Sequence, residues 1–211
     1  ITDPPVGEEV LPSCEIEGPV MALVGAAQGP ILMTGPVGSS IHVDQYRRGA
    51  WTRLGAVTIE RGEAFIGAVD HDAGLRLLLD AAETGARVTT LEGASQELSC
   101  VDPVGIVRVG PDLMVGCMHQ GVFEASWVLE DSQAVLARAT LDQPGAWMLV
   151  GGAATAGLVA PGGPEVRIRE IRPGASAIAP AVTLTRTSQF GTRLWSVFIS
   201  AGIGVAFILV L

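Results

Sequence analysis

The sequence contains no lysine and no asparagine, and all 13 of its basic residues are arginine. Without lysine, the chain has no Schiff-base amine, no P-loop lysine and no acceptor for ubiquitin. Without asparagine, it has no acceptor for N-glycosylation. The codons of both amino acids are rich in A, so we expect the gene to come from a GC-rich bacterial genome.

Positive charge is also scarce relative to negative charge. The 13 arginines face 22 acidic residues, which gives the chain a formal net charge of −9. Binding to a nucleic acid needs clustered basic side chains that neutralise phosphates. We therefore expect no nucleic acid among the partners of this protein.

Cysteine is limited to Cys14, Cys100 and Cys117, an odd and widely spaced set. The three cannot all pair within the chain, and they form no CxxC metal motif. One disulfide can still form, but we expect free thiols that act as small apolar side chains. Cysteine therefore does not decide the compartment.

Histidine is sparse too, with three residues, and two of them stand near other types of metal ligand. Asp72 follows His71, and Cys117 precedes His119 by two positions. All four residues are of types that ligate metal ions, but their spacing matches no known ligand pattern. We expect His71 to belong to a polar turn and predict no metal site.

Motifs for nucleophilic and phosphate chemistry are missing as well. No serine stands in a GxSxG sequence. The stretches GPVGSS and GGAATAG have neither the lysine of a phosphate loop nor GxGxxG spacing, so we predict turns in both. Carboxylates such as Glu60 and Glu63 are scattered, and we expect them to be solvated. The sequence thus predicts no catalytic residue and no cofactor.

Short β-favouring runs, mostly of four to eight residues, alternate with the 27 glycines and 13 prolines. Several runs alternate apolar and polar side chains, as in EVRIREI. This pattern predicts a mainly β fold, a compact β-rich barrel or sandwich. Near-regular strand spacing also suits propeller blades, but no repeat signature recurs. One stretch, SWVLEDSQAVLARA, can hold a short helix.

The chain ends with RLWSVFISAGIGVAFILVL, in which residues 194–211 carry no charge. Eighteen helical residues rise about 27 Å, close to the roughly 30 Å hydrocarbon core of a bilayer. A buried core helix can also be apolar all round, but we predict one C-terminal transmembrane helix. Arg193 and Trp195 would anchor it at the membrane interface.

Small residues follow one face of this predicted helix. Ser196, Ser200 and Gly204 lie at i, i+4 and i+8. Small side chains at this spacing let helices approach closely in lipid, so they predict a contact face for another membrane helix. Incidental small residues in a lone anchor are the alternative.

Composition also divides the chain. We predict an extended, Pro- and Glu-rich leader over 1–15 and a β-rich soluble domain over 16–171. A Pro/Ser/Thr-rich tether or last strand over 172–193 would lead to the membrane helix. Because the chain starts at isoleucine and stops inside an apolar run, we expect it to be a piece of a longer polypeptide.

A further pattern spans most of the chain. The stretch EIEGPVMALVGAAQGPILMTGPVGSSIHVDQYRRGAWTRLG has an I-E-G-x-V start, then a proline pair, a tyrosine and a tryptophan (Ile16, Glu17, Gly18, Val20, Pro30, Pro36, Tyr46, Trp51). With the terminal RLW helix, it resembles the GIDE-type, or beside-a-membrane, domain of the mitochondrial-anchored ubiquitin ligase family and its bacterial relatives. His42 or Val43 replaces the usual cysteine, and RING zinc ligands are missing, so ligase activity is not implied. The resemblance implies a β-rich domain between two membrane helices.

From these features we expect a non-catalytic, membrane-anchored accessory or structural subunit. Its partners would be other membrane protein subunits and the lipid bilayer, with the β domain packed beside the bilayer on a larger complex. A membrane-surface module that binds a lipid or a peptide is the alternative. A hydrolase or metal enzyme that uses Asp70, His71 and Asp72 is the third hypothesis.

The expected location is the bacterial inner membrane. Arg186 and Arg193 precede the predicted span, and the positive-inside rule would put that side in the cytoplasm. The family arrangement instead implies the outer, periplasmic side. We favour the periplasmic side for the soluble domain.

Overall fold

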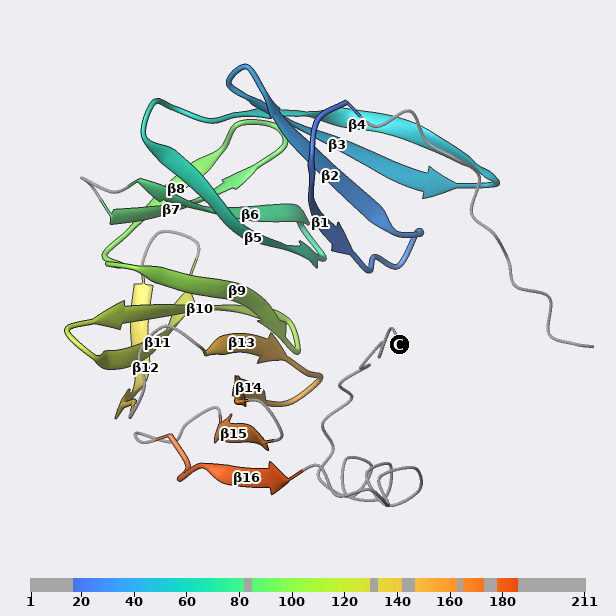
Figure 1. Cartoon of the computed structure of the whole chain (residues 1–211). Coiled ribbons are helices and arrows are strands. Elements are labelled where there is room, and N and C mark those ends of the chain that lie inside the picture. Colours follow the sequence, from blue (N-terminus) through green and yellow to red (C-terminus); the bar gives the residue numbers. More distant parts are fainter. Residues whose placement is uncertain are drawn as a thin grey trace, which may run out of the picture. The chain divides into compact units, whose positions relative to one another are not determined.

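The computed structural model describes residues 17–81, 85–129, 133–141, 147–162, 165–172 and 178–185. Within these residues every helix or strand assigned is a strand, which confirms the mainly β prediction (Figure 1). The short helix considered for SWVLEDSQAVLARA is wrong, because that stretch contains the end of one strand and most of the next. Both strands pair with a neighbour throughout their length, and this pairing outweighs a weak helical pattern.

The described strands form four antiparallel sheets of four strands each. In every sheet each strand pairs with the next one along the chain, so all four are simple meanders. They are open sheets rather than one closed barrel. Four-stranded meanders are the units from which propellers build their blades. The structure therefore repeats one topology although the sequence shows no repeat.

The chain divides into two compact units, Ile1–Glu60 and Arg61–Leu211. The boundary falls inside the region 16–171, which the sequence predicts as one domain. The first unit holds β1 (Val20–Val24), β2 (Ile31–Val37), β3 (Ser40–Arg47) and β4 (Ala50–Thr58).

The β3–β4 hairpin of the first unit shows how local sequence sets the register. Arg48 and Gly49 both have positive φ, of 51° and 87°, as a two-residue type I′ turn requires. This turn places Tyr46 opposite Trp51, with ring centroids 5.5 Å apart. Such cross-strand aromatic pairs stabilise a hairpin by roughly 0.2–1 kcal/mol.

The second unit contains three of the sheets. Its strands are β5 (Glu63–His71), β6 (Gly74–Ala81), β7 (Gly85–Thr90) and β8 (Ser95–Leu98); β9 (Pro103–Val109), β10 (Asp112–His119), β11 (Val122–Val128) and β12 (Gln133–Thr140); and β13 (Met148–Gly151), β14 (Ala156–Gly162), β15 (Glu165–Ile171) and β16 (Val182–Thr185). Strand β16 lies in the segment 172–193, which the sequence predicts to be either a tether or a last strand.

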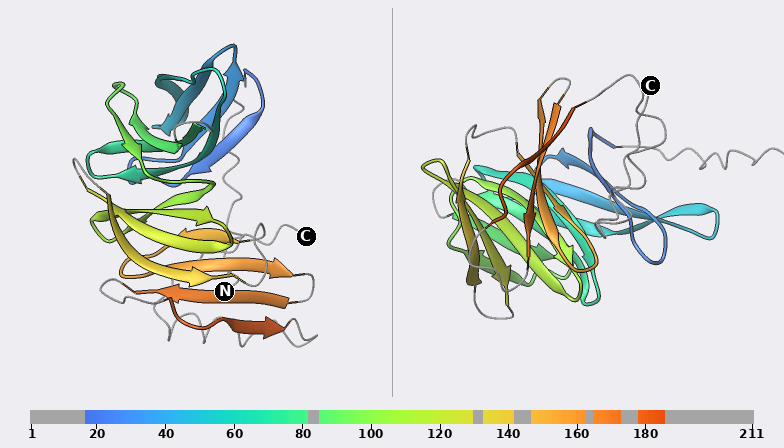
Figure 2. Two further views of the ribbon diagram at one scale, coloured as in Figure 1. Left: turned by 90° about the vertical axis from the view of Figure 1, so that its left-hand side faces the viewer. Right: turned by 90° about the horizontal axis from the view of Figure 1, so that it is seen from below.

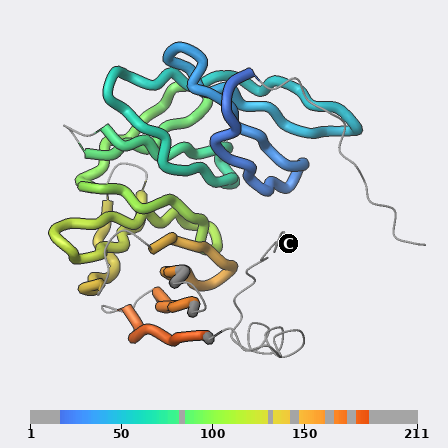
Figure 3. The backbone as a smooth tube through the Cα atoms, in the orientation of Figure 1, coloured from blue at the N-terminus to red at the C-terminus, as the bar shows by residue number. Residues whose placement is uncertain are grey.

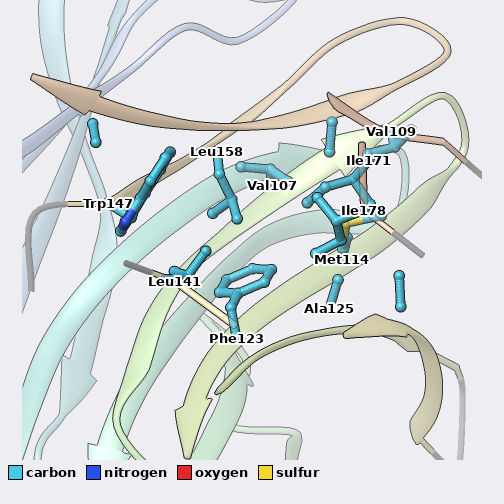
Figure 4. Close-up of a cluster of buried hydrophobic side chains, with 13 residues drawn as sticks. Val107, Val109, Met114, Phe123, Ala125, Leu141, Trp147, Leu158, Ile171 and Ile178 are labelled. Atoms are coloured by element: carbon cyan, nitrogen blue, oxygen red, sulfur yellow. The ribbon is translucent and has the colours of Figure 1, made fainter. Parts of the chain in front are cut away.

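Within the second unit the β9–β12 sheet lies between the other two (Figures 1 and 2), and Figure 3 follows the chain from each meander to the next. One face of this sheet packs Ile106 and Val115 against Leu78 of β6. Its other face packs Phe123 against Leu158 of β14, and Figure 4 shows both side chains in one apolar cluster. Burial of a side chain as large as Phe123 contributes about 1.5–3 kcal/mol.

This middle position explains the sequence of β10. A strand with one solvated face alternates apolar and polar residues, but β10 is buried from residue 113 to residue 117 without a break. Strand β9 lies beside both β5 and β13, so the first strands of the three meanders are neighbours. The two faces of this sheet thus join the three sheets into one folded unit.

Several sequence predictions fall on turns or outside the described residues. GPVGSS covers the end of β2, the turn that follows it and the first residue of β3, with positive φ at Gly35 and Gly38. GGAATAG covers the end of β13, the connection to β14 and the start of β14, so each stretch contains a predicted turn but also strand residues. The leader 1–15 and the predicted span 194–211 lie outside the described residues. Within those residues, none of the secondary structure is a helix of the length and apolarity that a bilayer crossing needs.

Candidate functional site

The Asp70–His71–Asp72 cluster joins two turns. His71 Nε2 lies 2.7 Å from the carbonyl oxygen of Pro111, and His71 Nδ1 lies 3.3 Å from the backbone N–H of Ala73. Because a carbonyl only accepts, Nε2 carries the proton and Nδ1 accepts from Ala73. Asp72 forms an ion pair of 2.8 Å with Arg108. Both imidazole nitrogens are therefore engaged, and His71 belongs to a polar turn as predicted.

Cys117 does not act as a thiol. It forms a disulfide with Cys100, with 5.6 Å between the two Cα atoms, and both side chains are almost completely buried. The expectation of free apolar thiols is wrong for this pair, and Cys117 is not available as a thiolate ligand. His119, two residues further on, is exposed at the end of β10. In the described part of the chain, no three His, Cys, Asp or Glu side chains gather closely enough to hold a metal ion.

The expectation that Glu63 is solvated is also wrong. Its side chain is 5% exposed and accepts two hydrogen bonds from Arg87, from Nε to Oε1 and from Nη2 to Oε2, the second at 2.6 Å. This bidentate pair joins β5 to β7 across β6. Burial of the carboxylate is compatible with folding because the guanidinium fork matches both oxygens. Glu60 is exposed, as expected.

A second cluster of charged side chains lies on the first unit. His42 Nδ1 lies 3.1 Å from a carboxylate oxygen of Glu17, and Arg53 donates from Nε to Asp44 at 2.6 Å. Asp44 is buried and faces Arg53 directly in the register of β3 and β4. These contacts satisfy the acidic groups locally, so the cluster stabilises the sheet.

A cavity of about 450 Å³ lies where the β5–β8 sheet faces the β9–β12 sheet. Its walls combine charged, polar and apolar side chains (His71, Arg76, Val88, Thr90, Gln96, Asp112, Leu113, Val128). This volume is within the range of pockets that hold small molecules. The cavity is partly open to solvent and is a candidate ligand site of the second unit.

The outer face of the β13–β16 sheet carries an apolar row. Met148, Val159, Ile168 and Val182 stand opposite one another in the register of the four strands. This face is turned away from the core, because Leu158, which neighbours Val159, points into the core. Met148 is 52% and Val182 60% exposed at the two edges of the sheet, whereas Ile168 is partly buried and Val159 is only 5% exposed. We call this set the apolar row.

The predicted membrane residues lie outside the described part of the chain. These are the small-residue face of the span and the two interface anchors (Ser196, Ser200, Gly204, Arg193, Trp195). They stay predictions. The cavity and the apolar row are instead features that the sequence analysis missed. Alternation in EVRIREI was a signal for the row, because it put Ile168 and Val166 on one face, but it does not reveal which face is covered.

No protein-family model matches the chain, and no curated protein matches it in sequence. Among solved structures, it is similar to the crystal structure of a protein of unknown function from Bacteroides caccae, with 10% sequence identity and a TM-score of 0.49. The similarity covers 77% of this chain and 60% of the other one. The chain therefore spans less than two thirds of the length of that protein. The resemblance to GIDE-type domains stays a prediction.

Proposed function

We propose that the protein is a non-catalytic, membrane-anchored accessory subunit whose β domain binds another protein of a membrane complex. The observation that carries this proposal is the apolar row on the β13–β16 sheet. Two of its four side chains are more than half exposed, and Val166 and Leu184 extend the same face with partly buried side chains. The row thus exposes apolar side chains on both edge strands of the sheet, and exposed apolar side chains that gather on one face are typical of a protein interaction surface.

The position of this sheet in the chain supports a partner in the membrane. Strand β16 ends at Thr185, and the predicted span begins at residue 194. The eight residues between them reach at most about 30 Å when fully extended. A sheet attached by so short a segment stays near the bilayer surface, where the extramembrane parts of membrane proteins lie.

The disulfide between Cys100 and Cys117 supports the periplasmic side for the domain. Disulfides form and persist in oxidising compartments, including the bacterial periplasm, and are rare in the cytosol. This argument is independent of the arginines before the span, which favour the cytoplasmic side.

Native electrophoresis of detergent-solubilised membranes tests the accessory role. The double variant M148E/V182E puts two charges into the apolar row. V135E is the matched control, because Val135 on β12 is 49% exposed and lies outside the row. We expect the wild type and V135E to migrate in a complex well above 21.8 kDa, and M148E/V182E to migrate as the monomer. A wild-type monomer, or an intact complex of the double variant, would overturn the proposal.

Thiol labelling tests the side of the membrane. Cells are denatured in the presence of a maleimide that carries a polyethylene glycol chain, with and without prior reduction. With three cysteines in the chain, we expect one adduct without reduction and three after it. Three adducts without reduction would mean that the pair is reduced in the cell and would contradict a periplasmic domain.

A further inference from the structure

The wall of the cavity departs from the apolar pattern of the interface between the two sheets. Leu78 and Val88 stand opposite each other on β6 and β7 and belong to the core between the sheets. Arg76 and Thr90 form the row next to them on the same face, two residues further along each strand. An arginine thus takes a place on the inner face of a sheet where an apolar residue would extend the core.

Two opposite charges line this cavity without being paired. Arg76 is partly buried on β6, and Asp112 is exposed at the start of β10 on the facing sheet. Among the described residues, neither forms a hydrogen bond or an ion pair with its side chain. Arg76 acts at longer range on Glu92, whose pKa is lowered mainly by a hydrogen bond from its own backbone N–H, then by the side chain of Thr90, and least by this positive charge. The guanidinium of Arg76 is partly removed from water, and a ligand carboxylate would relieve the cost of that burial. Asp112 is solvated and can pair with a cationic group at the mouth of the cavity.

Between the charges the walls are apolar. Val88, Leu113 and Val128 supply aliphatic surface to the cavity. His71 lies at the rim but offers no free nitrogen, because both are engaged by the backbone. The cavity therefore offers a ligand one cation, one anion and an aliphatic wall, together with the neutral polar side chains of Thr90, Ser95 and Gln96.

We infer that this cavity binds a small zwitterion with an aliphatic body, an apolar α-amino acid of about the size of leucine. The carboxylate of the ligand would pair with Arg76, its ammonium group with Asp112, and its side chain would pack on Val88, Leu113 and Val128. Guanidinium and carboxylate groups match in geometry, which favours a carboxylate at Arg76. This inference does not depend on membrane attachment or on the apolar row.

Three probes of one carbon skeleton separate the two charge contacts. L-leucine carries both charges, 4-methylpentanoate carries only the carboxylate, and isopentylamine carries only the ammonium group. Each is titrated into the full chain in detergent micelles and followed by isothermal titration calorimetry. We expect saturable binding of L-leucine, with a Kd at least about tenfold below those of the two other probes, because each lacks one charge-assisted contact.

Variants assign the contacts. We expect R76Q and D112N each to weaken L-leucine binding about tenfold or more, while R76K retains part of the affinity. R138Q is the control, because Arg138 is an exposed arginine of the same unit that pairs with Glu124 and does not line the cavity. Circular dichroism checks that every variant is folded. Absence of saturable L-leucine binding, equal binding of 4-methylpentanoate, or unchanged affinity in R76Q would overturn the inference.

Discussion

The imidazole of His71 donates a hydrogen bond of 2.7 Å from Nε2 to the carbonyl oxygen of Pro111. His71 ends β5, and Pro111 lies in the turn between β9 and β10. The two residues are 40 positions apart in sequence, and their contact joins two sheets. The ion pair between Asp72, in the β5–β6 turn, and Arg108, near the end of β9, joins the same two hairpins. Polar residues that look like a metal or catalytic motif in the sequence therefore hold the rim of a cavity.

His71→Phe is expected to lower the stability of the protein by about 1–2 kcal/mol, because an aromatic ring stays while both hydrogen bonds of the imidazole are lost. Stability is measured by urea unfolding of the full chain in detergent, with tryptophan fluorescence as the probe and the shift of the unfolding midpoint as the result. His119→Phe is the control, because His119 is exposed at the end of β10. Equal shifts in the two variants would contradict a linking role for His71.

The strands were largely predictable from the sequence because each is a short, local pattern. The alternation in EVRIREI predicts a strand, and β15 spans Glu165–Ile171. The β10 segment shows the limit of such patterns. Its run of buried residues has no alternation because the β9–β12 sheet is covered on both faces, and a single sequence does not show how sheets stack.

The pairings between distant residues were not predictable. Cys100 precedes β9, and the β9–β10 hairpin brings Cys117 back beside it, so their proximity depends on the register of this hairpin. Glu63 and Arg87 meet because the meander places β5 and β7 on either side of β6. In each case composition gives the residue types, but only the topology gives the partner.

The disulfide should contribute measurably to stability. It closes a loop with a sequence separation of 17 residues, for which loss of the bond costs roughly 3 kcal/mol in the chain-entropy account. We expect the C100S/C117S double variant to show this loss in urea unfolding. Both variant and reference carry Cys14→Ser, so that no other thiol contributes. A loss well below 1 kcal/mol would show that the pair is dispensable for the fold.

At Gly151, β13 approaches β9 closely. A Cβ atom added there would lie 2.4 Å from the carbonyl oxygen of Arg108 and 2.9 Å from Cβ of Val107. We expect Gly151→Ala to destabilise the protein by about 1–3 kcal/mol, because backbone would have to move. Gly105→Ala is the control, since its added Cβ would meet only Leu149 Cβ at 3.6 Å. The midpoints of thermal unfolding of Gly151→Ala and Gly105→Ala are compared. Equal midpoints would contradict a close approach of the backbone at Gly151.

The Glu63–Arg87 pair yields the strongest prediction. Arg87→Met removes the guanidinium and leaves a carboxylate that is 5% exposed without its bidentate partner, which costs about 3–5 kcal/mol. Replacement of both residues removes the buried charge as well. We therefore expect the double variant E63L/R87M to be more stable than Arg87→Met alone and close to the wild type.

Urea unfolding of the wild type, Glu63→Leu, Arg87→Met and E63L/R87M completes a double-mutant cycle for this pair. Arg138→Met serves as the control for the loss of an arginine, because the Arg138–Glu124 pair has a 65% exposed arginine, and exposed pairs contribute at most about 1 kcal/mol. A small loss in Arg87→Met, similar to that in Arg138→Met, would mean that Glu63 is solvated in solution. A double variant as unstable as Arg87→Met would show that packing around β5 and β7, rather than the buried charge, sets the cost.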